Sequence, residues 1–368
     1  MKQPLITVLM TVYNGGSYLK RSVSDVLSQT LKDFEFLIIN DCSTDKTAEV
    51  IESFNDPRIR LVTNEKNLGQ TRSLNKGLRL ARGNYVARID ADDGAFSHWL
   101  EEQARSVNEK PEHAVISANA VVVDEFDKIR KTSFVPSDLG EIKMRAIIRS
   151  PINHVGSVMK VENVLAVGGY DETFKLAADY DLWVKLLAAG QKITVTEKPL
   201  VSIRSHSQSA SKRGRGSIDG AEIESIMGKA VGAFSSVAQD KDRLHWLCQA
   251  IYDEGSLGDR EFGEAINYLK DIYLNLKSSV TADKSKIRAW VSGQERTAYL
   301  KRIHAKILDG DLDQVKWAAR RGRKAFGSGS VFTLILAVAS LGNPAARMIP
   351  KGYFLLQSLS AKFRMGLF

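Results

Sequence analysis

Cysteine is scarce in this 368-residue chain, which carries only Cys42 and Cys248. The two residues lie far apart in the sequence and form no metal-binding or redox spacing, so the pattern excludes a zinc ribbon and a disulfide-stapled scaffold. We expect both to be small, buried or half-buried residues in a reducing compartment.

Long hydrophobic runs are also missing. The longest apolar block, residues 331–339, spans only half a bilayer. The first eight residues enter a strand pattern at once, without the apolar region and cleavage site of a signal peptide. We therefore expect a cytoplasmic protein whose contact with the inner face of the cell membrane, if any, is peripheral.

Acidic residues are rare in the last part of the chain. Residues 301–368 hold twelve Lys and Arg against three Asp, so this tail accounts for the whole net charge of +9. The balanced charge of residues 1–300 argues against a nucleic-acid partner, whereas the tail favours an anionic one.

The tail has two open interpretations: peripheral attachment to anionic lipid headgroups, or an ordinary helical bundle or dimer interface, the latter making the protein a homo-oligomer. Its basic and hydrophobic residues are Trp317, Arg320, Arg321, Arg323, Lys324, Phe326, Lys351, Tyr353, Phe354, Leu355, Leu359, Lys362, Phe363 and Arg364.

Strand and helix patterns alternate over the first 110 residues. Period-2 or continuous apolar segments predict strands, and apolar residues three or four apart predict helices. The predicted strands are 5–11, 34–40, 59–62 and 85–89, and the helices between them are 18–29, 45–54 and 69–81. Strict alternation predicts an α/β fold with a mostly parallel, Rossmann-like sheet.

The alternation becomes less regular from residue 115 to 201, where the pattern predicts a strand at 115–123 and helices at 138–149 and 182–189. Residues 205–220 are rich in Ser, Gly and basic residues and read as a linker or loop. Only helical periodicity follows. We therefore expect a catalytic domain at residues 1–215 and a helical region at residues 216–368.

Polar and acidic residues follow four of the predicted strands, at residues 11–14, 40–43, 64–67 and 90–93. In parallel sheets, ligands bind beyond the carboxyl ends of the strands. The segment Asp90-Ala91-Asp92-Asp93 brings three carboxylates together, which repel one another unless a cation lies among them. The pattern predicts a crevice for a nucleotide and a metal ion.

Six segments, in order and with matching spacing, resemble family 2 of the inverting glycosyltransferases, which have the GT-A fold. They are ITVLMTVYN (6–14), VLSQT (26–30), IINDCSTD (38–45), NLGQTRSLNKG (67–77), DADD (90–93) and DYDLW (179–183). The resemblance covers roughly residues 4–210 and leaves the C-terminal third unmatched.

The resemblance implies a nucleotide-binding set of Thr11, Tyr13, Asp41, Arg72, Asp90 and Ala91. In it, Thr11 and Asp41 bind a uracil-type base, Arg72 approaches the nucleotide and Asp90 lies near the ribose. The alternatives are that Asp41 caps the turn that follows it and that Arg72 is a solvated helix residue.

The resemblance also implies metal ligands and a catalytic base. Asp92 would bind Mn²⁺ or Mg²⁺, with Asp93 as a second ligand and His206 brought in by a loop. Asp179 would take the proton of the acceptor hydroxyl. A solvated loop histidine is the alternative for His206, and a carboxylate stabilised by the helix dipole is the alternative for Asp179.

Other residues have weaker assignments. His154 either lines the acceptor side or plays a structural part, and the basic segment at residues 212–215 either clamps phosphates or is a charged linker.

Two residues depart from the family pattern. Cys42 stands where Gly is usual, so the turn after Asp41 must either avoid positive φ or tolerate strain. Ala178 replaces the acidic residue that usually precedes the catalytic Asp, so we expect Asp179 to lack a like-charged neighbour that would raise its pKa.

These observations predict an inverting, metal-dependent transfer of a sugar from a nucleotide-sugar, with UDP as the expected carrier. A saccharide or lipid-linked saccharide would accept the sugar, in surface polysaccharide biosynthesis. A sugar nucleotidyltransferase is one alternative, although the loop at residues 13–17 lacks the basic residue that such an enzyme needs. A non-catalytic GT-A scaffold is the other.

Overall fold

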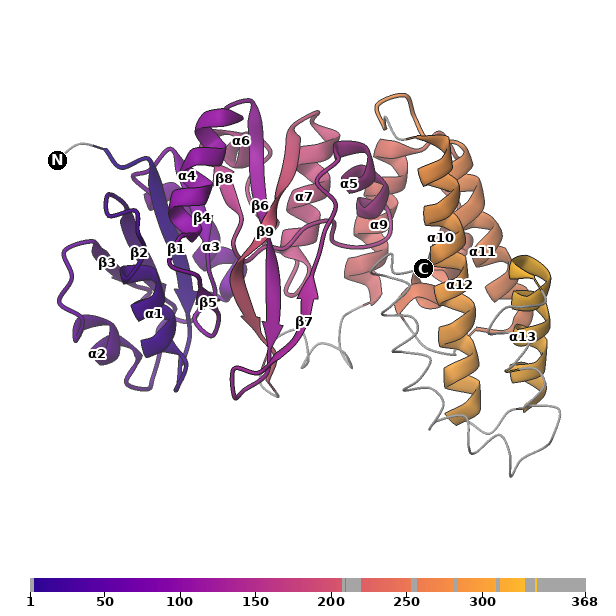
Figure 1. Ribbon diagram of the computed structural model, residues 1–368, viewed down its shortest axis with the longest axis horizontal. Helices are drawn as coiled ribbons and strands as arrows, with labels where there is room; N and C mark the ends of the chain where they lie inside the picture. Colours follow the sequence, from indigo (N-terminus) through magenta and orange to yellow (C-terminus); the bar gives the residue numbers. More distant parts are fainter. Residues whose placement is uncertain are drawn as a thin grey trace. The chain divides into compact units, whose positions relative to one another are not determined.

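The computed structural model describes residues 3–206, 209, 220–252, 257–280, 283–308, 312–327 and 335 (Figure 1). The chain divides into two compact units. The first comprises residues 1–238 together with 276–281, and the second comprises 239–275 and 282–368. The predicted basic segment at 212–215 and the tail residues 351–364 lie outside the described residues.

The first unit contains a nine-stranded sheet, ordered β3-β2-β1-β4-β8-β6-β9-β5, with β7 paired to β6. Its parallel part holds β3 (Ile59–Thr63), β2 (Glu35–Asn40), β1 (Ile6–Val12) and β4 (Tyr85–Arg88). The connecting helices are α1 (Leu19–Leu27), α2 (Thr47–Glu52) and α3 (Gln70–Leu80). The expected strand–helix alternation is confirmed.

Every residue of β1 and β2 is buried, as expected for parallel strands covered on both faces. Val12 pairs with Asn40 and Leu9 with Arg88, so the strands β1, β2 and β4 end at the same edge of the sheet. The residues that follow these ends are therefore brought near one another.

The other part of the sheet is mixed. It contains β8 (Val158–Lys160), β6 (His113–Val123), β9 (Lys192–Arg204), β5 (Gly94–Ala95) and β7 (Ile129–Ser133). Strand β9 runs parallel to β6, whereas β8, β5 and β7 pair antiparallel. The fold is the expected GT-A-like α/β sheet followed by helices.

Five helices complete the first unit's described elements. They are α4 (Trp99–Glu109), α5 (Leu139–Ala146), α6 (Val161–Ala166), α7 (Ala178–Ala188) and α9 (Gly220–Phe234). Helix α9 packs beside α7 and belongs to the first unit, which the contacts extend to Ala238. The domain boundary at residue 215 stays a prediction.

The chain returns to the first unit after α11. Leu276 forms a β-bridge with Ser235, Lys277 N–H donates to the Phe234 carbonyl (2.9 Å), and Lys143 Nζ donates to the Ser279 carbonyl (2.7 Å). Residues 276–281 therefore close the first unit although they follow two helices of the second.

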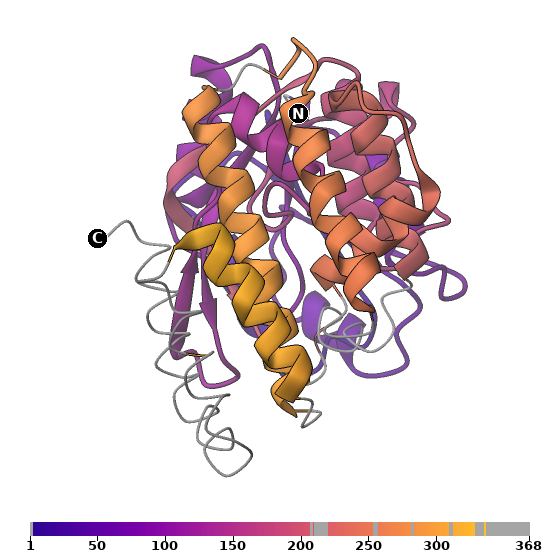
Figure 2. The same cartoon turned by 90° about the vertical axis from the view of Figure 1, so that its right-hand side faces the viewer.

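The second unit is helical, as expected from its periodicity. Helices α10 (Lys241–Tyr252), α11 (Asp259–Leu274), α12 (Lys284–Leu308) and α13 (Leu312–Phe326) pack side by side (Figure 1 and Figure 2). Arg302 lies buried in this unit over the rings of Phe262 and Trp317. Among the described helices, even the 25-residue α12 lacks the apolar composition that a membrane-spanning segment needs.

The turn after β2 is strained. Cys42 has a φ of 62°, in the left-handed region that favours glycine. The sequence left open whether the turn avoids positive φ or tolerates strain. The chain tolerates strain, because a cysteine side chain stands at a positive-φ position.

Candidate active site

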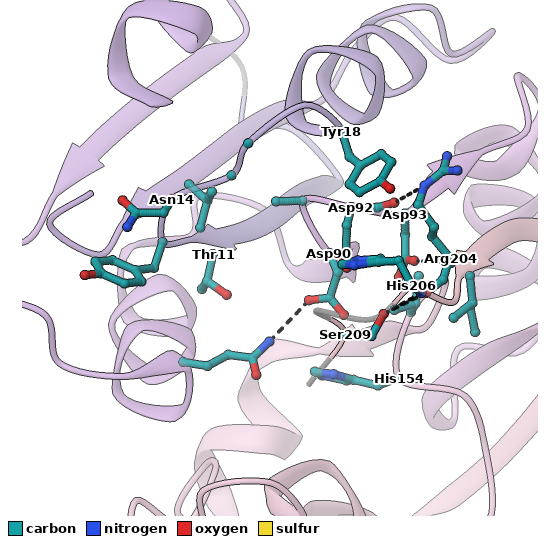
Figure 3. A pocket seen from close by; sticks show the side chains of 18 of the residues that line it. Thr11, Asn14, Tyr18, Asp90, Asp92, Asp93, His154, Arg204, His206 and Ser209 are labelled. Atoms are coloured by element: carbon teal, nitrogen blue, oxygen red, sulfur yellow. Dashed lines mark hydrogen bonds and ion pairs between the residues drawn. The ribbon is translucent and has the colours of Figure 1, made fainter. Parts of the chain in front are cut away.

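A cavity of about 830 Å³ lies at the carboxyl edge of the parallel strands (Figure 3). Residues from the ends of β1, β4 and β9 and from the starts of α3 and α7 line it. Among them are Thr11, Tyr13, Tyr18, Gln70, Asp90, Ala91, Asp92, Asp93, His154, Lys175, Leu176, Asp179, Arg204 and His206. Segments far apart in the sequence thus share one cavity, as the positions of the strand ends predict.

The three carboxylates after β4 have different partners. Asp90 pairs with the buried Arg88 guanidinium and accepts a hydrogen bond from Gln70 Nε2 (3.2 Å). Asp92 Oδ2 lies 2.9 Å from His206 Nε2, and Figure 3 shows both side chains at the cavity. Because each carboxylate has its own partner, the cluster is ordered rather than a solvated acidic turn.

Asp93 differs from the other two carboxylates because it is buried. It accepts a hydrogen bond from the backbone N–H of Arg204 (2.7 Å). Burial raises the pKa of the Asp93 carboxyl, and the charges of Asp90 and Asp92 raise it further. Asp93 therefore joins the end of the acidic segment at residues 90–93 to the end of β9, and its assignment as a metal ligand stays a prediction.

Arg204 holds the acidic loop from the side of β9. Its side chain is buried; Nε donates to the Asp92 carbonyl (3.0 Å) and Nη2 pairs with Asp127 (2.7 Å). The guanidinium also lies 4.6 Å from the centre of the Tyr18 ring. These contacts fix the backbone that carries Asp92. They also fix the end of β9, and His206 follows Arg204 by two residues.

A divalent cation fits this donor set in part. The Asp92 carboxylate, which His206 faces at 2.9 Å, suits Mn²⁺ or Mg²⁺ bound also by phosphate oxygens. Within the described residues, no three His, Cys, Asp or Glu side chains form a complete metal cage. The remaining ligands would come from the substrate and water.

Asp179 lies in the first turn of α7 and faces the cavity. The pKa of Asp179 is raised to about 6, mainly by burial and in part by the charge of Asp90. The expectation that Asp179 lacks a like-charged neighbour is therefore wrong, because Asp90, just after β4, supplies the charge. A carboxyl with this pKa can accept a proton near neutral pH.

His154 and Tyr170 form a neutral pair beside the cavity. His154 Nε2 lies 2.7 Å from the Tyr170 hydroxyl, and the imidazole packs against Trp183. The pKa of His154 is lowered to about 3, mainly by burial and in part by the charge of Arg88. His154 thus offers an uncharged polar surface to the cavity.

The predicted nucleotide-binding residues divide into two groups. Thr11, Tyr13, Asp90 and Ala91 line the cavity. Asp41 and Arg72 are not among the lining residues, and Arg72 pairs with Glu172 (3.3 Å). The functional roles of all six stay predictions.

Asp41 is buried and orders the loop before α3. Its carboxylate accepts hydrogen bonds from Asn64 Nδ2 (2.7 Å) and from the backbone N–H groups of Leu68 and Gly69 (both 2.8 Å). The alternative that Asp41 caps the turn after it is wrong: its partners lie 23 to 28 residues further along the chain, and the Ser43 N–H of that turn donates to Asn40 Oδ1 instead.

Sequence reasoning missed Arg88 and Arg204. Arg88 is a charged residue inside the apolar strand that precedes the acidic cluster. This position was a signal for a structural role, because a buried charge needs a partner. Arg204 offered no such signal, since its partners come from distant segments.

Comparisons with known proteins agree with this geometry. A family model described as "Glycosyl transferase family 2" matches residues 7–161. An uncharacterized glycosyltransferase of Methanocaldococcus jannaschii is 34% identical over 55% of this chain and 72% of its own length. An amylovoran biosynthesis glycosyltransferase, AmsE of Erwinia amylovora, is 27% identical over 57% of this chain and 79% of its own length.

Among solved structures, S. aureus TarS in complex with UDP-GlcNAc has a similar fold. The TM-score is 0.54 with 17% sequence identity, over 87% of this chain and 91% of that one.

Proposed function

The chain belongs to glycosyl transferase family 2, and from this premise we propose that it transfers a sugar from a nucleotide-sugar to a hydroxyl of a saccharide or lipid-linked saccharide. The observation that carries the proposal is the shared cavity, in which Asp179 of α7 and the acidic cluster after β4 face the same space. One carboxylate would act on the acceptor while the others act on the donor.

Asp179 would be the catalytic base. In a single displacement, the acceptor oxygen attacks the anomeric carbon as the bond to the nucleoside diphosphate breaks, and the configuration at that carbon inverts. Asp179 accepts the hydroxyl proton as the new bond forms. The transition state would resemble an oxocarbenium ion, as in glycoside hydrolysis. The raised pKa of Asp179, about 6, supports this assignment.

The donor would bind along the acidic edge. Thr11, Tyr13 and Ala91 would contact the nucleoside and Asp90 the ribose, while Asp41 supports the site by ordering the loop before α3. The TarS complex holds UDP-GlcNAc on a similar fold, so UDP-sugars are the first donors to test.

Asp92 and His206 would hold Mn²⁺ or Mg²⁺. When bound, the cation would neutralise charge on the departing diphosphate. Asp93 would support Asp92 through Arg204 and stays the candidate for a second ligand. We also propose a place in surface polysaccharide biosynthesis, because a relative of similar sequence is named for amylovoran biosynthesis.

The test is nucleotide release from a panel of UDP- and GDP-sugars, with Mn²⁺ and with EDTA. We expect release from at least one UDP-sugar, its loss in EDTA, and its loss in Asp179→Asn but not in the matched control Asp33→Asn, which alters an exposed loop. Proton NMR of the product reports the anomeric configuration. Release of no nucleotide by the wild-type protein would favour the scaffold alternative, and pyrophosphate formation from a sugar phosphate would favour the nucleotidyltransferase.

A further inference from the structure

We propose that α9 is a positioning element of the active site: Glu222 and Lys229 hold the loop at residues 175–177 and the first turn of α7, and thereby fix Asp179. The inference rests on the proposed function for the role of Asp179 as base. Neither Glu222 nor Lys229 touches the cavity, so both would act through the backbone and through Asp181.

Helix α7 begins without a cap of its own. Ala177 is its N-cap residue and provides no side-chain hydrogen bond. Helix starts normally use Ser, Thr, Asp or Asn to satisfy their free N–H groups. Within the first turn, the Asp179 carboxylate accepts backbone hydrogen bonds from Asp179 and Tyr180, whereas the segment just before the helix is held from elsewhere in the chain.

Glu222 holds the segment that leads into α7. Its Oε1 accepts a hydrogen bond from the Lys175 N–H (2.8 Å), and its Oε2 accepts bonds from the Leu176 (3.2 Å) and Ala177 (3.3 Å) N–H groups. One carboxylate thus binds three consecutive N–H groups directly before the helix that carries Asp179. Hydrogen bonds to a charged acceptor are stronger than those between neutral groups.

Lys229 makes a second link, on the other side of Asp179. Its ammonium pairs with Asp181 Oδ1 (2.6 Å) and lies 4.8 Å from the centre of the Phe174 ring. Asp181 is fully buried and pairs also with Lys185 (3.2 Å). Because a buried carboxylate is costly without its partners, α7 can hold Asp181 in this position only while these cations are present.

The two links lie on one face of α9. Glu222, the buried Ile226 and Lys229 are four and three residues apart, a spacing that places them along one side of a helix. This side faces α7, beside which α9 runs in Figure 1. Since Lys175 and Leu176 line the cavity, the face positions the cavity wall as well as the base.

Helix α9 lies beyond residues 7–161, which the family model matches. The residues matched by the family model therefore include neither α9 nor Asp179.

The experiment combines hydrogen–deuterium exchange with kinetics on the full-length chain. The variants are Glu222→Ala, Glu222→Gln and Lys229→Met, with Glu52→Ala on the exposed end of α2 as the matched control. We expect Glu222→Ala to speed exchange at residues 175–177 and to lower kcat by about 10- to 100-fold, with the donor KM within about twofold of wild type. Glu222→Gln keeps one acceptor oxygen, so its exchange rate at residues 175–177 and its kcat should lie between those of Glu222→Ala and the wild type.

Unchanged exchange at residues 175–177 in Glu222→Ala would overturn the inference. It would also be overturned if exchange there became faster while the kcat of Glu222→Ala stayed equal to that of the Glu52→Ala control. If Glu222→Ala does not fold, Glu222→Gln and Lys229→Met decide by the same criteria. A wild-type protein inactive on every donor would instead contradict the proposed function, and the exchange data would still decide whether α9 holds the loop.

Discussion

The pKa of Asp179 links activity and stability to pH in opposite directions. The group has a pKa of about 6 in the folded chain against 3.8 for an ordinary Asp. A base must be ionised to accept a proton, so we expect kcat/KM to fall about tenfold per pH unit below pH 6. At pH 5 about one molecule in ten would be active.

The effect of Asp179 on folding stability has the opposite sign. Because folding raises the pKa of Asp179, the folded chain binds this proton more tightly than the unfolded chain does. This tighter proton binding stabilises the folded state fully below pH 3.8, and the stabilisation is lost as the pH rises through about 6. A shift from 3.8 to about 6 corresponds to about 3 kcal/mol. Since Asp179 is only partly buried and faces the cavity, we expect about 2 kcal/mol in practice.

Asp179→Asn should therefore be inactive and yet more stable than wild type by about 2 kcal/mol at pH 7. Urea unfolding at pH 7 and at pH 4 measures this difference, which should nearly vanish at the lower pH. Initial rates of nucleotide release between pH 4.5 and 8.5 give the activity profile. An acidic limb with its midpoint near pH 4, or an Asn variant no more stable than wild type at pH 7, would refute the reasoning.

Three further predictions concern single residues. Cys42→Gly should raise the free energy of unfolding by about 1 kcal/mol, because the φ of 62° strains a side chain but not glycine, and urea unfolding would show it; an unchanged midpoint would contradict the strain. Asp92→Asn should weaken Mn²⁺ activation at least tenfold in a metal titration of nucleotide release, and an unaltered titration would remove Asp92 from the cation site. Arg88→Met should cost about 1 to 3 kcal/mol, because the partly exposed Asp90 and the carbonyls of Leu9 and Ile89 lose their guanidinium partner; thermal unfolding measures the loss, and an unchanged midpoint would show that the pair matters little.

The parallel part of the fold could be predicted from the sequence because local patterns determine it. Continuous apolar strands such as β1 and β2, separated by amphipathic helices, have few other arrangements. The mixed part could not be predicted in this way. Strand β5 has two residues and β8 has three, and both owe their existence to pairing with distant strands rather than to their own composition.

The site shows the same division. The acidic cluster and Asp179 stand out as motifs, and the structure brings them to one cavity. What each carboxylate contacts could not be read from the motif: Asp93 faces the backbone of Arg204, and Asp41 faces the loop before α3. Glu222 gives no signal at all, because its partners lie 45 to 47 residues earlier in the chain.

The return of residues 276–281 to the first unit has a consequence for how the chain folds during synthesis. The β-bridge between Ser235 and Leu276 and the bond from Lys143 to Ser279 can form only after α10 and α11 have left the ribosome. The catalytic unit therefore cannot finish folding when its last helix emerges. A fragment that stops between residues 239 and 275 would leave that unit without its closing segment and expose the surface that the segment covers.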